Sequence, residues 1–150
     1  MQIDEDLIFL NPEAESIDIL FKLMCTALEK KGWVKDDLCI CLTNREREFP
    51  TGLDTGSIKI AIPHTGPDKV TCEGMAVAVL KKPLDFGEMG STGPKLLPVK
   101  IVFLLLLKKG RAKFYHKLLN KIKNSDILLR IYQADSRQAI CQLLMKSLNT

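Results

Sequence analysis

The sequence predicts an α/β sandwich built on a mixed β-sheet, with residues 1–150 forming one domain. Two segments suited to buried strands, residues 75–80 and 99–107, are apolar on almost every residue. This pattern is typical of strands that helices cover on both faces. Stretches with helical spacing of apolar residues lie before and after them. The predicted order is therefore one strand, two helices, several strands and a final group of helices.

The first strand and the first helix are expected before residue 33. Residues 7–10 form a short apolar run, and Asn11, Pro12 and Glu13 follow it. Asparagine caps free helix N–H groups, proline suits the first helical position and glutamate favours the positive end of the helix dipole. A helix is thus predicted from this point to Gly32. Its core-facing stripe comprises Ile17, Leu20, Phe21, Met24 and Leu28.

A second helix is expected to begin at Asp36 or Asp37, either of which can cap it. Its polar last turns, residues 44–48, lead through Phe49-Pro50-Thr51-Gly52 towards the next strand. Charged side chains at this helix end are therefore expected near that strand. The residues expected to face the core are Leu38, Cys39 and Leu42.

Residues 57–66 are the stretch that most suggests a function. Ile58, Ile60 and Ile62 alternate with less apolar residues, which predicts a strand with one apolar face. Pro63 ends the strand because proline has no N–H to give a neighbouring strand. His64 is then expected at a rigid strand end, clear of the sheet, with the Thr65 hydroxyl beside it. By pattern alone, a histidine in such a place is more often structural than catalytic.

The second half of the chain is expected to contain a long loop and three helices. Residues 82–98 are rich in Gly, Pro, Ser and Thr, which predicts a loop available for partner contact. Ser125 and Ser136 are predicted caps of the last two helices. The apolar residues of the three helices are Phe114, Leu118, Leu119 and Ile122; Ile127, Leu128 and Ile131; and Ala139, Ile140, Leu143, Leu144 and Leu148.

Composition excludes several classes of protein. The longest apolar run, residues 101–107, is much shorter than the roughly 20 residues of a membrane-spanning helix. The start of the chain is acidic where a secretory signal is basic, so a cytoplasmic protein without membrane insertion is expected. Five cysteines form no CxxC pair and only two histidines accompany them, so we expect reduced thiols and no metal. A catalytic thiolate is the less favoured alternative.

The net charge of +4 is mild. Residues 108–113 form a basic cluster, which is usually a solvated loop but is also able to meet phosphate. The cluster lacks the interleaved aromatic residues on which single-stranded nucleic acid stacks. No nucleic-acid partner is therefore expected.

Phe49-Pro50-Thr51-Gly52, followed by Ile60-Ala61-Ile62-Pro63-His64-Thr65, resembles the signature of enzyme IIA components of the bacterial phosphoenolpyruvate:sugar phosphotransferase system, fructose/mannitol class. The resemblance is closest to the galactitol-type branch, where a Phe-Pro-Thr-Gly run precedes the histidine strand. It extends in element order over nearly all of the chain and implies a three-layer α/β/α sandwich. Ser57-Ile58-Lys59 stands where the fructose and mannitol branches usually have a glycine, and the spacer Asp54-Thr55-Gly56 is longer than in the mannitol form. Both departures favour the galactitol-like branch.

The resemblance implies a phosphocarrier. His64 would accept a phosphoryl group from phospho-HPr and give it to a cysteine of an enzyme IIB, which acts with the membrane IIC during uptake and phosphorylation of a sugar or sugar alcohol, possibly galactitol. A neutral imidazole is a suitable nucleophile near pH 7, and this chemistry needs no metal or other cofactor.

The resemblance also implies roles for other side chains. Arg45-Glu46 matches an arginine–glutamate pair of the family, in which the arginine lies at the phosphorylated histidine. Arg47 is the rival, since the sequence does not tell which side of the helix faces the site. Thr65 is the other candidate for stabilising phosphate. A histidine on the helix after the last long strand often lies beside the phosphorylated one, which implies that His116 assists His64; without the resemblance, His116 is a polar residue at the edge of an apolar stripe.

Two alternative functions stay open. The chain is also similar to regulatory modules, such as the nitrogen-related enzyme IIA or the IIA-like domains of transcription regulators, whose phosphorylation state controls another protein. The lack of a helix-turn-helix argues against the fused-regulator form. The other alternative is a binding domain without phosphoryl chemistry.

Overall fold

A single mixed sheet forms the centre of the protein. The computed structural model describes residues 2–91, 93 and 95–148, and within them five strands lie in the order β1-β4-β5-β3-β2. β1 (Gln2–Leu10) is parallel to β4 (Gly74–Gly87), and β4 is antiparallel to β5 (Leu96–Leu106). β3 (Ile60–Ala61) is parallel to β5 and antiparallel to β2 (Gly52–Leu53) at the far edge. The predicted mixed sheet is confirmed.

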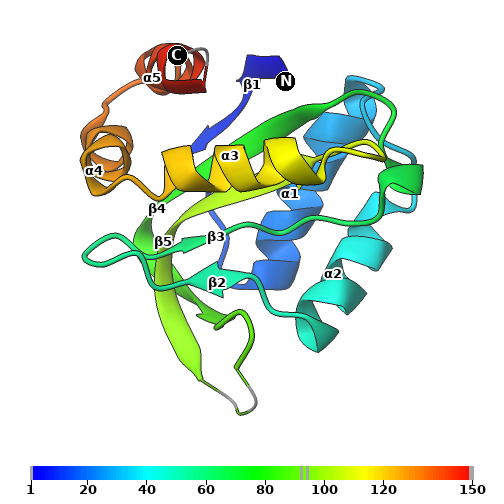
Figure 1. Cartoon of the computed structure of the whole chain (residues 1–150), viewed down its shortest axis with the longest axis horizontal. Coiled ribbons are helices and arrows are strands. Elements are labelled where there is room, and N and C mark those ends of the chain that lie inside the picture. The colour runs from blue at the N-terminus through cyan, green and yellow to red at the C-terminus, as the bar shows by residue number, and fades with distance from the viewer. Residues whose placement is uncertain (1, 92, 94, 149–150) are drawn as a thin grey trace.

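Helices cover both faces of this sheet (Figure 1). α1 (Ile17–Lys30) and α2 (Leu38–Glu48) pack on one face, whereas α3 (Ala112–Ile122), α4 (Ser125–Gln133) and α5 (Arg137–Leu148) pack on the other. Each face has its own buried apolar cluster. Alternate residues of β5 belong to different clusters: Val102 packs in the cluster with α1 and α2, whereas Phe103 packs in the cluster with α3, α4 and α5. The nearly continuous apolar sequence of β5 follows from this double covering. The three-layer α/β/α sandwich is confirmed.

The start of α1 differs from the prediction. Asn11 does not cap a helix but takes a positive φ of 49°, where the chain leaves β1. Asparagine tolerates this conformation better than most residues, and here that property outweighs its capping preference. Ser16 is the cap, and its hydroxyl oxygen accepts a hydrogen bond from the Ile19 N–H at 3.2 Å. The predicted helix end is confirmed at Gly32, which has a φ of 71°.

Three other caps were tested by the structure. Asp37 precedes α2, but its carboxylate pairs with Lys69 instead of capping the helix. Asn124 caps α4 by accepting from two backbone N–H groups, so the prediction of Ser125 was wrong by one residue. Ser136 caps α5 as predicted, since its hydroxyl accepts from the Ala139 N–H at 3.1 Å.

The prediction of a loop over residues 82–98 was wrong, because most of this segment belongs to β4 and β5. β4 and β5 continue past a register shift between Val79 and Leu84 and form a hairpin that reaches Gly87 and Leu96. Leu84, Phe86, Leu97 and Val99 are buried in the cluster that faces α1 and α2. The Gly, Pro and Lys residues of this segment are typical of loops, so the alternation of buried and exposed residues was not recognised as a strand pattern. Positions 92 and 94 of the predicted loop lie outside the described residues.

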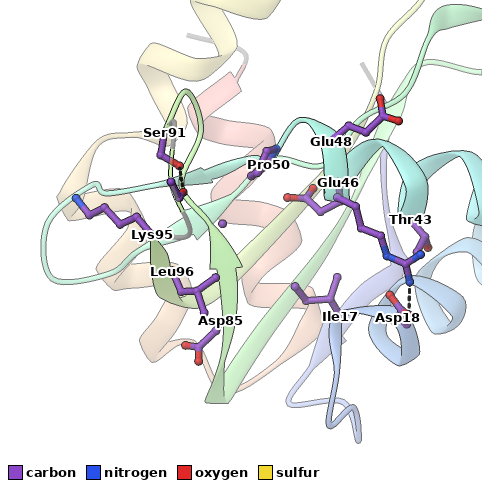
Figure 2. A pocket seen from close by; sticks show the side chains of 13 residues that line it. Ile17, Asp18, Thr43, Glu46, Glu48, Pro50, Asp85, Ser91, Lys95 and Leu96 are labelled. Atoms are coloured by element: carbon purple, nitrogen blue, oxygen red, sulfur yellow. Dashed lines mark hydrogen bonds and ion pairs between the residues drawn. The ribbon is translucent and has the colours of Figure 1, made fainter.

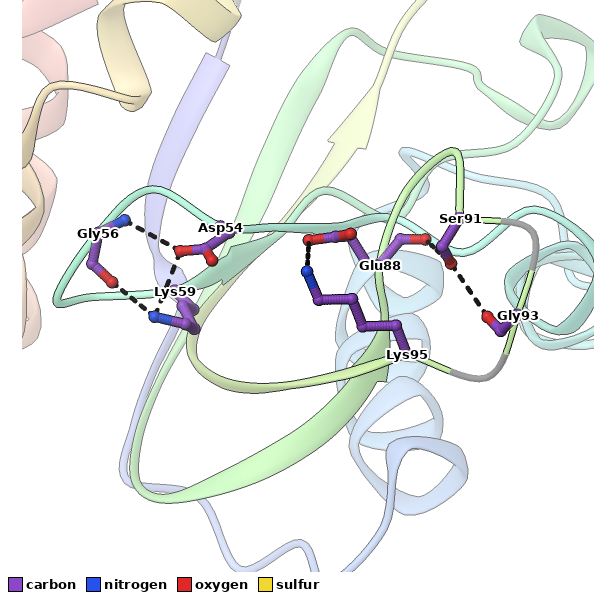
Figure 3. A network of polar contacts seen from close by, with 7 residues as sticks. All are labelled: Asp54, Gly56, Lys59, Glu88, Ser91, Gly93 and Lys95. Carbon is purple, nitrogen blue, oxygen red and sulfur yellow. Dashed lines mark hydrogen bonds and ion pairs between the residues drawn. The ribbon is translucent and has the colours of Figure 1, made fainter.

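Polar contacts fasten the two turns near β3 (Figure 3). In the turn between β2 and β3, the Lys59 ammonium group donates to the Gly56 carbonyl at 2.7 Å and pairs with Asp54 at 3.3 Å. At the hairpin tip, Lys95 pairs with Glu88 at 3.3 Å. The first turn joins the short strands β2 and β3, which lead to His64, and the second joins β4 to β5. No helix of the described residues has the length and apolar character needed to cross a membrane.

Candidate functional site

The backbone at His64 is anchored on both sides. The Ile62 N–H donates to the Thr51 carbonyl at 3.2 Å, and the Leu105 N–H of β5 donates to the Pro63 carbonyl at 2.9 Å. His64 and Leu105 form an isolated parallel bridge just beyond β3. The alternation predicted for this stretch is confirmed, because Ile58, Ile60 and Ile62 all enter one buried cluster. His64 is thus mounted on the end of a pinned strand, and its side chain is half-buried.

The imidazole of His64 is oriented by its own backbone. Nδ1 lies 2.8 Å from the Ile62 carbonyl oxygen. Because a carbonyl oxygen only accepts hydrogen bonds, this contact places the proton of the neutral ring on Nδ1. Nε2 then keeps its lone pair.

The surroundings of His64 favour the neutral ring. Burial lowers the pKa of His64 below its ordinary 6.5, and the positive charge of Arg45 lowers it further. The hydrogen bond to Ile62 acts in the opposite direction on this pKa. The net effect is a lowered pKa, so the imidazole is uncharged at neutral pH and its Nε2 is free, as a nucleophile requires.

The two candidate arginines lie in different surroundings. Arg45 is the one whose charge acts on His64, and its guanidinium carbon lies 5.7 Å from the centre of the Phe49 ring. Arg47 instead pairs with Asp18 of α1 at 3.2 Å. This pair lies at a cavity of about 490 Å³ between α2 and the β4–β5 hairpin (Figure 2), which His64 does not line. The charge of Arg45, and not that of Arg47, is therefore the one that lowers the pKa of His64.

Glu46 and Thr51 link α2 to the histidine strand. The buried Glu46 carboxylate accepts from the Thr51 N–H at 2.7 Å and from the Thr51 hydroxyl at 2.8 Å. Burial raises the pKa of Glu46, and both hydrogen bonds oppose that rise. Thr51 in turn accepts from Ile62. The Pro-Thr-Gly run therefore connects the helix that carries Arg45 to the strand that carries His64.

Gly52 completes this connection because no side chain fits there. A Cβ atom on Gly52 would lie 2.6 Å from the Gly87 carbonyl oxygen of β4. That separation is shorter than van der Waals contact allows, so only glycine lets β2 approach the hairpin this closely.

Thr65 and His116, the other two candidate residues, differ in burial. The Thr65 hydroxyl is half-buried and donates to the Gly66 carbonyl at 3.3 Å, which is long for such a bond. His116 is exposed on α3, and its ring and the Tyr115 ring form an edge-type contact with 5.9 Å between ring centres. Among the described residues, no hydrogen bond or ring contact joins His116 directly to His64.

Tyr115 is the residue that sequence reasoning missed. Its ring centre lies 5.5 Å from that of His64, with the two planes tilted by 52°. The spacing of Tyr115, Leu118, Leu119 and Ile122 along α3 would have placed Tyr115 on the inward face. The prediction instead named the neighbouring His116 as the candidate residue of this helix.

A small basic cavity adjoins His64. It has a volume of about 200 Å³, and its lining includes Tyr115, Lys108 and Arg111. Arg111 is held by Glu73, which accepts from its Nε at 3.0 Å, and lies over the ring of Phe114 at 4.2 Å. Part of the predicted basic loop is therefore ordered beside the histidine. No group of three or more His, Cys, Asp or Glu side chains able to hold a metal occurs within residues 2–91, 93 and 95–148.

Comparison with known families gives a match over nearly the whole chain. Residues 1–147 match the family model described as phosphoenolpyruvate-dependent sugar phosphotransferase system, EIIA 2. The transcriptional regulator ManR of Bacillus subtilis (strain 168) is 34% identical over 102 residues, which is 68% of this chain. The aligned region spans only 14% of ManR.

Solved structures share the fold. Enzyme IIA of the Escherichia coli mannitol system, in its complex with phosphorylated enzyme IIB, is 19% identical with a TM-score of 0.77, and the match covers 97% of this chain and 98% of that one. The nitrogen regulatory protein IIA-Ntr of Neisseria meningitidis is 24% identical with a TM-score of 0.73, and the match covers 94% of each chain. At such identities these likenesses show a common fold and nothing finer.

Proposed function

We propose that this chain, which belongs to the EIIA 2 family of the phosphoenolpyruvate-dependent sugar phosphotransferase system, carries a phosphoryl group on His64. The single observation that supports this best is the state of the His64 ring. Its Nδ1 is 2.8 Å from a carbonyl oxygen and burial keeps it neutral, so Nε2 has a lone pair ready to attack phosphorus.

The transfer step follows from this arrangement. The Nε2 lone pair forms a bond to phosphorus while the bond from phosphorus to the donor nitrogen of phospho-HPr breaks, and that electron pair returns to the donor imidazole. The His64 ring then bears a substituent on both nitrogens and a positive charge. The Ile62 carbonyl oxygen stabilises that charge through its hydrogen bond to Nδ1–H. In the second step a cysteine thiolate of an enzyme IIB attacks phosphorus, the bond from Nε2 to phosphorus breaks, and its electron pair returns to the His64 ring.

Arg45 and Thr65 are the proposed ligands of the phosphoryl oxygens. A loose transition state leaves charge on those oxygens, and a protein lowers its energy by placing donors around them. Arg45 supplies a permanent positive charge near the ring, and Thr65 supplies a hydroxyl in the adjacent residue. Arg47 has no part in this proposal because its partner is Asp18.

The test is phosphoryl uptake from phosphoenolpyruvate in the presence of enzyme I and HPr. We expect an acid-labile phosphate on the wild-type chain and none on His64→Ala. The labelling rate of His116→Ala tests whether His116 assists His64. Label that persists in His64→Ala would contradict the assignment of His64. The galactitol assignment stays a prediction, which uptake of galactitol in a strain lacking this gene would test.

The match to ManR favours a second candidate, a regulatory domain whose histidine phosphorylation controls another protein. The two candidates differ in the fate of the phosphoryl group. Transfer from the labelled chain to the cysteine of an enzyme IIB encoded beside it supports the transport role. Label that remains on this chain in the presence of that IIB supports the regulatory role.

A further inference from the structure

Two contacts of different kinds hold the His64 ring. The hydrogen bond from Nδ1 to the Ile62 carbonyl fixes one edge of the ring. The Tyr115 ring lies 5.5 Å away, centre to centre, and the planes are tilted by 52°. This separation is within the range of favourable contacts between aromatic rings. The hydrogen bond comes from the histidine's own strand, whereas the ring contact comes from α3.

A second contact is needed because rotation of a histidine ring about χ2 is soft. One hydrogen bond at Nδ1 leaves Nε2 able to swing, and a reacting atom displaced by an ångström slows a transfer severely. Tyr115 is suited to limit that motion, since it packs against the buried cluster beneath α3. The Tyr115 ring thus contacts the His64 ring while it is itself held by the core.

Tyr115 also shares an electrostatic environment with His64. The charge of Arg45 acts on both side chains: it lowers the pKa of His64, and it partly offsets the burial that raises the pKa of Tyr115. Three elements thus bring one side chain each to the same place, α2 with Arg45, the end of β3 with His64 and α3 with Tyr115. The phosphoryl group of the proposed function would occupy this region.

Resting on the proposed function, we propose that Tyr115 is a positioning residue for phosphoryl transfer, whose ring holds the His64 imidazole so that Nε2 faces the incoming group. The ring contact carries this role, and the hydroxyl is not required for it. Tyr115 also covers part of the imidazole and so contributes to its burial.

The variants Tyr115→Phe and Tyr115→Ala separate the ring from the hydroxyl. With phospho-HPr as donor, we expect Tyr115→Phe to keep kcat within about twofold of wild type, and Tyr115→Ala to lower kcat by about tenfold to a hundredfold with little change in KM. Lys117→Ala, at an exposed position of the same helix, is the matched control and should behave as wild type. Equal losses in Tyr115→Phe and Tyr115→Ala, or none in either, would overturn the proposal.

Nitrogen NMR of His64 in the isolated protein gives a readout that needs no partner. We expect wild type and Tyr115→Phe to show one ring tautomer with the proton on Nδ1, and Tyr115→Ala to show a mixture of both and a higher His64 pKa. Tyr115→Leu, which keeps an apolar side chain for the core, should give the same mixture if Tyr115→Ala does not fold. An unchanged tautomer in these variants contradicts the positioning role, whereas a wild-type chain that takes no phosphate contradicts the proposed function itself.

Discussion

The Glu46 carboxylate receives two hydrogen bonds from one residue, Thr51, at 2.7 Å from the backbone nitrogen and 2.8 Å from the hydroxyl. Glu46 is 9% exposed and Thr51 is 3% exposed, so water does not replace either bond. The pair joins the helix of Arg45 to the strand of His64. Its removal should therefore affect both stability and phosphoryl transfer.

We expect Glu46→Ala to lower the free energy of unfolding by about 1–3 kcal/mol, because it leaves two buried Thr51 donors unpaired. Thr51→Val removes only the hydroxyl donor and should cost less. The double variant should cost less than the sum of the two single variants, since the residues act through one contact. Urea denaturation of all four proteins measures these differences, and strict additivity would show that the two residues are not coupled.

The two neighbouring arginines should respond differently to substitution. Arg45→Ala is expected to slow phosphoryl uptake from phospho-HPr by about 10²–10³-fold, because it removes a positive charge that acts at His64, where the phosphoryl charge would develop. Arg47→Ala is the matched control, and it should stay close to wild type because Arg47 pairs with Asp18 at the surface. Equal rates for the two variants would remove Arg45 from the proposed site.

The pKa of His64 should lie below 6.5 and respond to Arg45. Proton NMR titration is expected to show a higher His64 pKa in Arg45→Ala, although still below 6.5, because burial is the larger cause of the shift. Arg45→Lys keeps the positive charge and should change the pKa less. A His64 pKa above 6.5 in the wild type would contradict the burial seen in the structure.

The same shift predicts how stability depends on pH. The folded state binds a proton at His64 less readily than the unfolded chain does, so this residue's contribution is complete above pH 6.5 and is lost as pH falls through the lowered pKa. Between pH 7.5 and pH 5.5, wild type should lose more unfolding free energy than His64→Ala. Denaturant midpoints at the two pH values measure the difference, and an equal loss in both proteins would refute it.

Gly52→Ala should destabilise the protein because its Cβ would meet the Gly87 carbonyl oxygen at 2.6 Å. Overpacking of this kind costs about 1–3 kcal/mol. Gly93→Ala is a suitable control, since nothing lies within 4 Å of a Cβ there. Thermal unfolding of both variants tests the expectation, and a Gly52→Ala midpoint equal to that of wild type would show that β2 is free to shift.

Features governed by local pattern could be predicted from the sequence. The alternation of Ile58, Ile60 and Ile62 and the apolar character of the central strands appear in the structure as expected. Asn11 shows the limit of local reasoning, because one residue type suits both a helix cap and a left-handed turn. The surrounding chain decides between the two.

The side chains around His64 could be predicted only in part. The choice between Arg45 and Arg47 depends on the rotation of α2, which the Arg47–Asp18 pair and the buried Glu46 reveal. Tyr115 was missed because its contact with His64 depends on how α3 lies across the sheet. Helical spacing indicates that Tyr115 faces inward, but it does not indicate that His64 is the residue it meets.

The bridge between His64 and Leu105 has a consequence for protein synthesis. The ribosome makes His64 well before it makes the strand that pins the histidine backbone in place. A nascent chain that ends before β5 therefore lacks the bridge that holds the His64 backbone, even though the histidine is already present. Under the proposed function, His64 is therefore held in place for phosphoryl transfer only after β5 has joined the sheet.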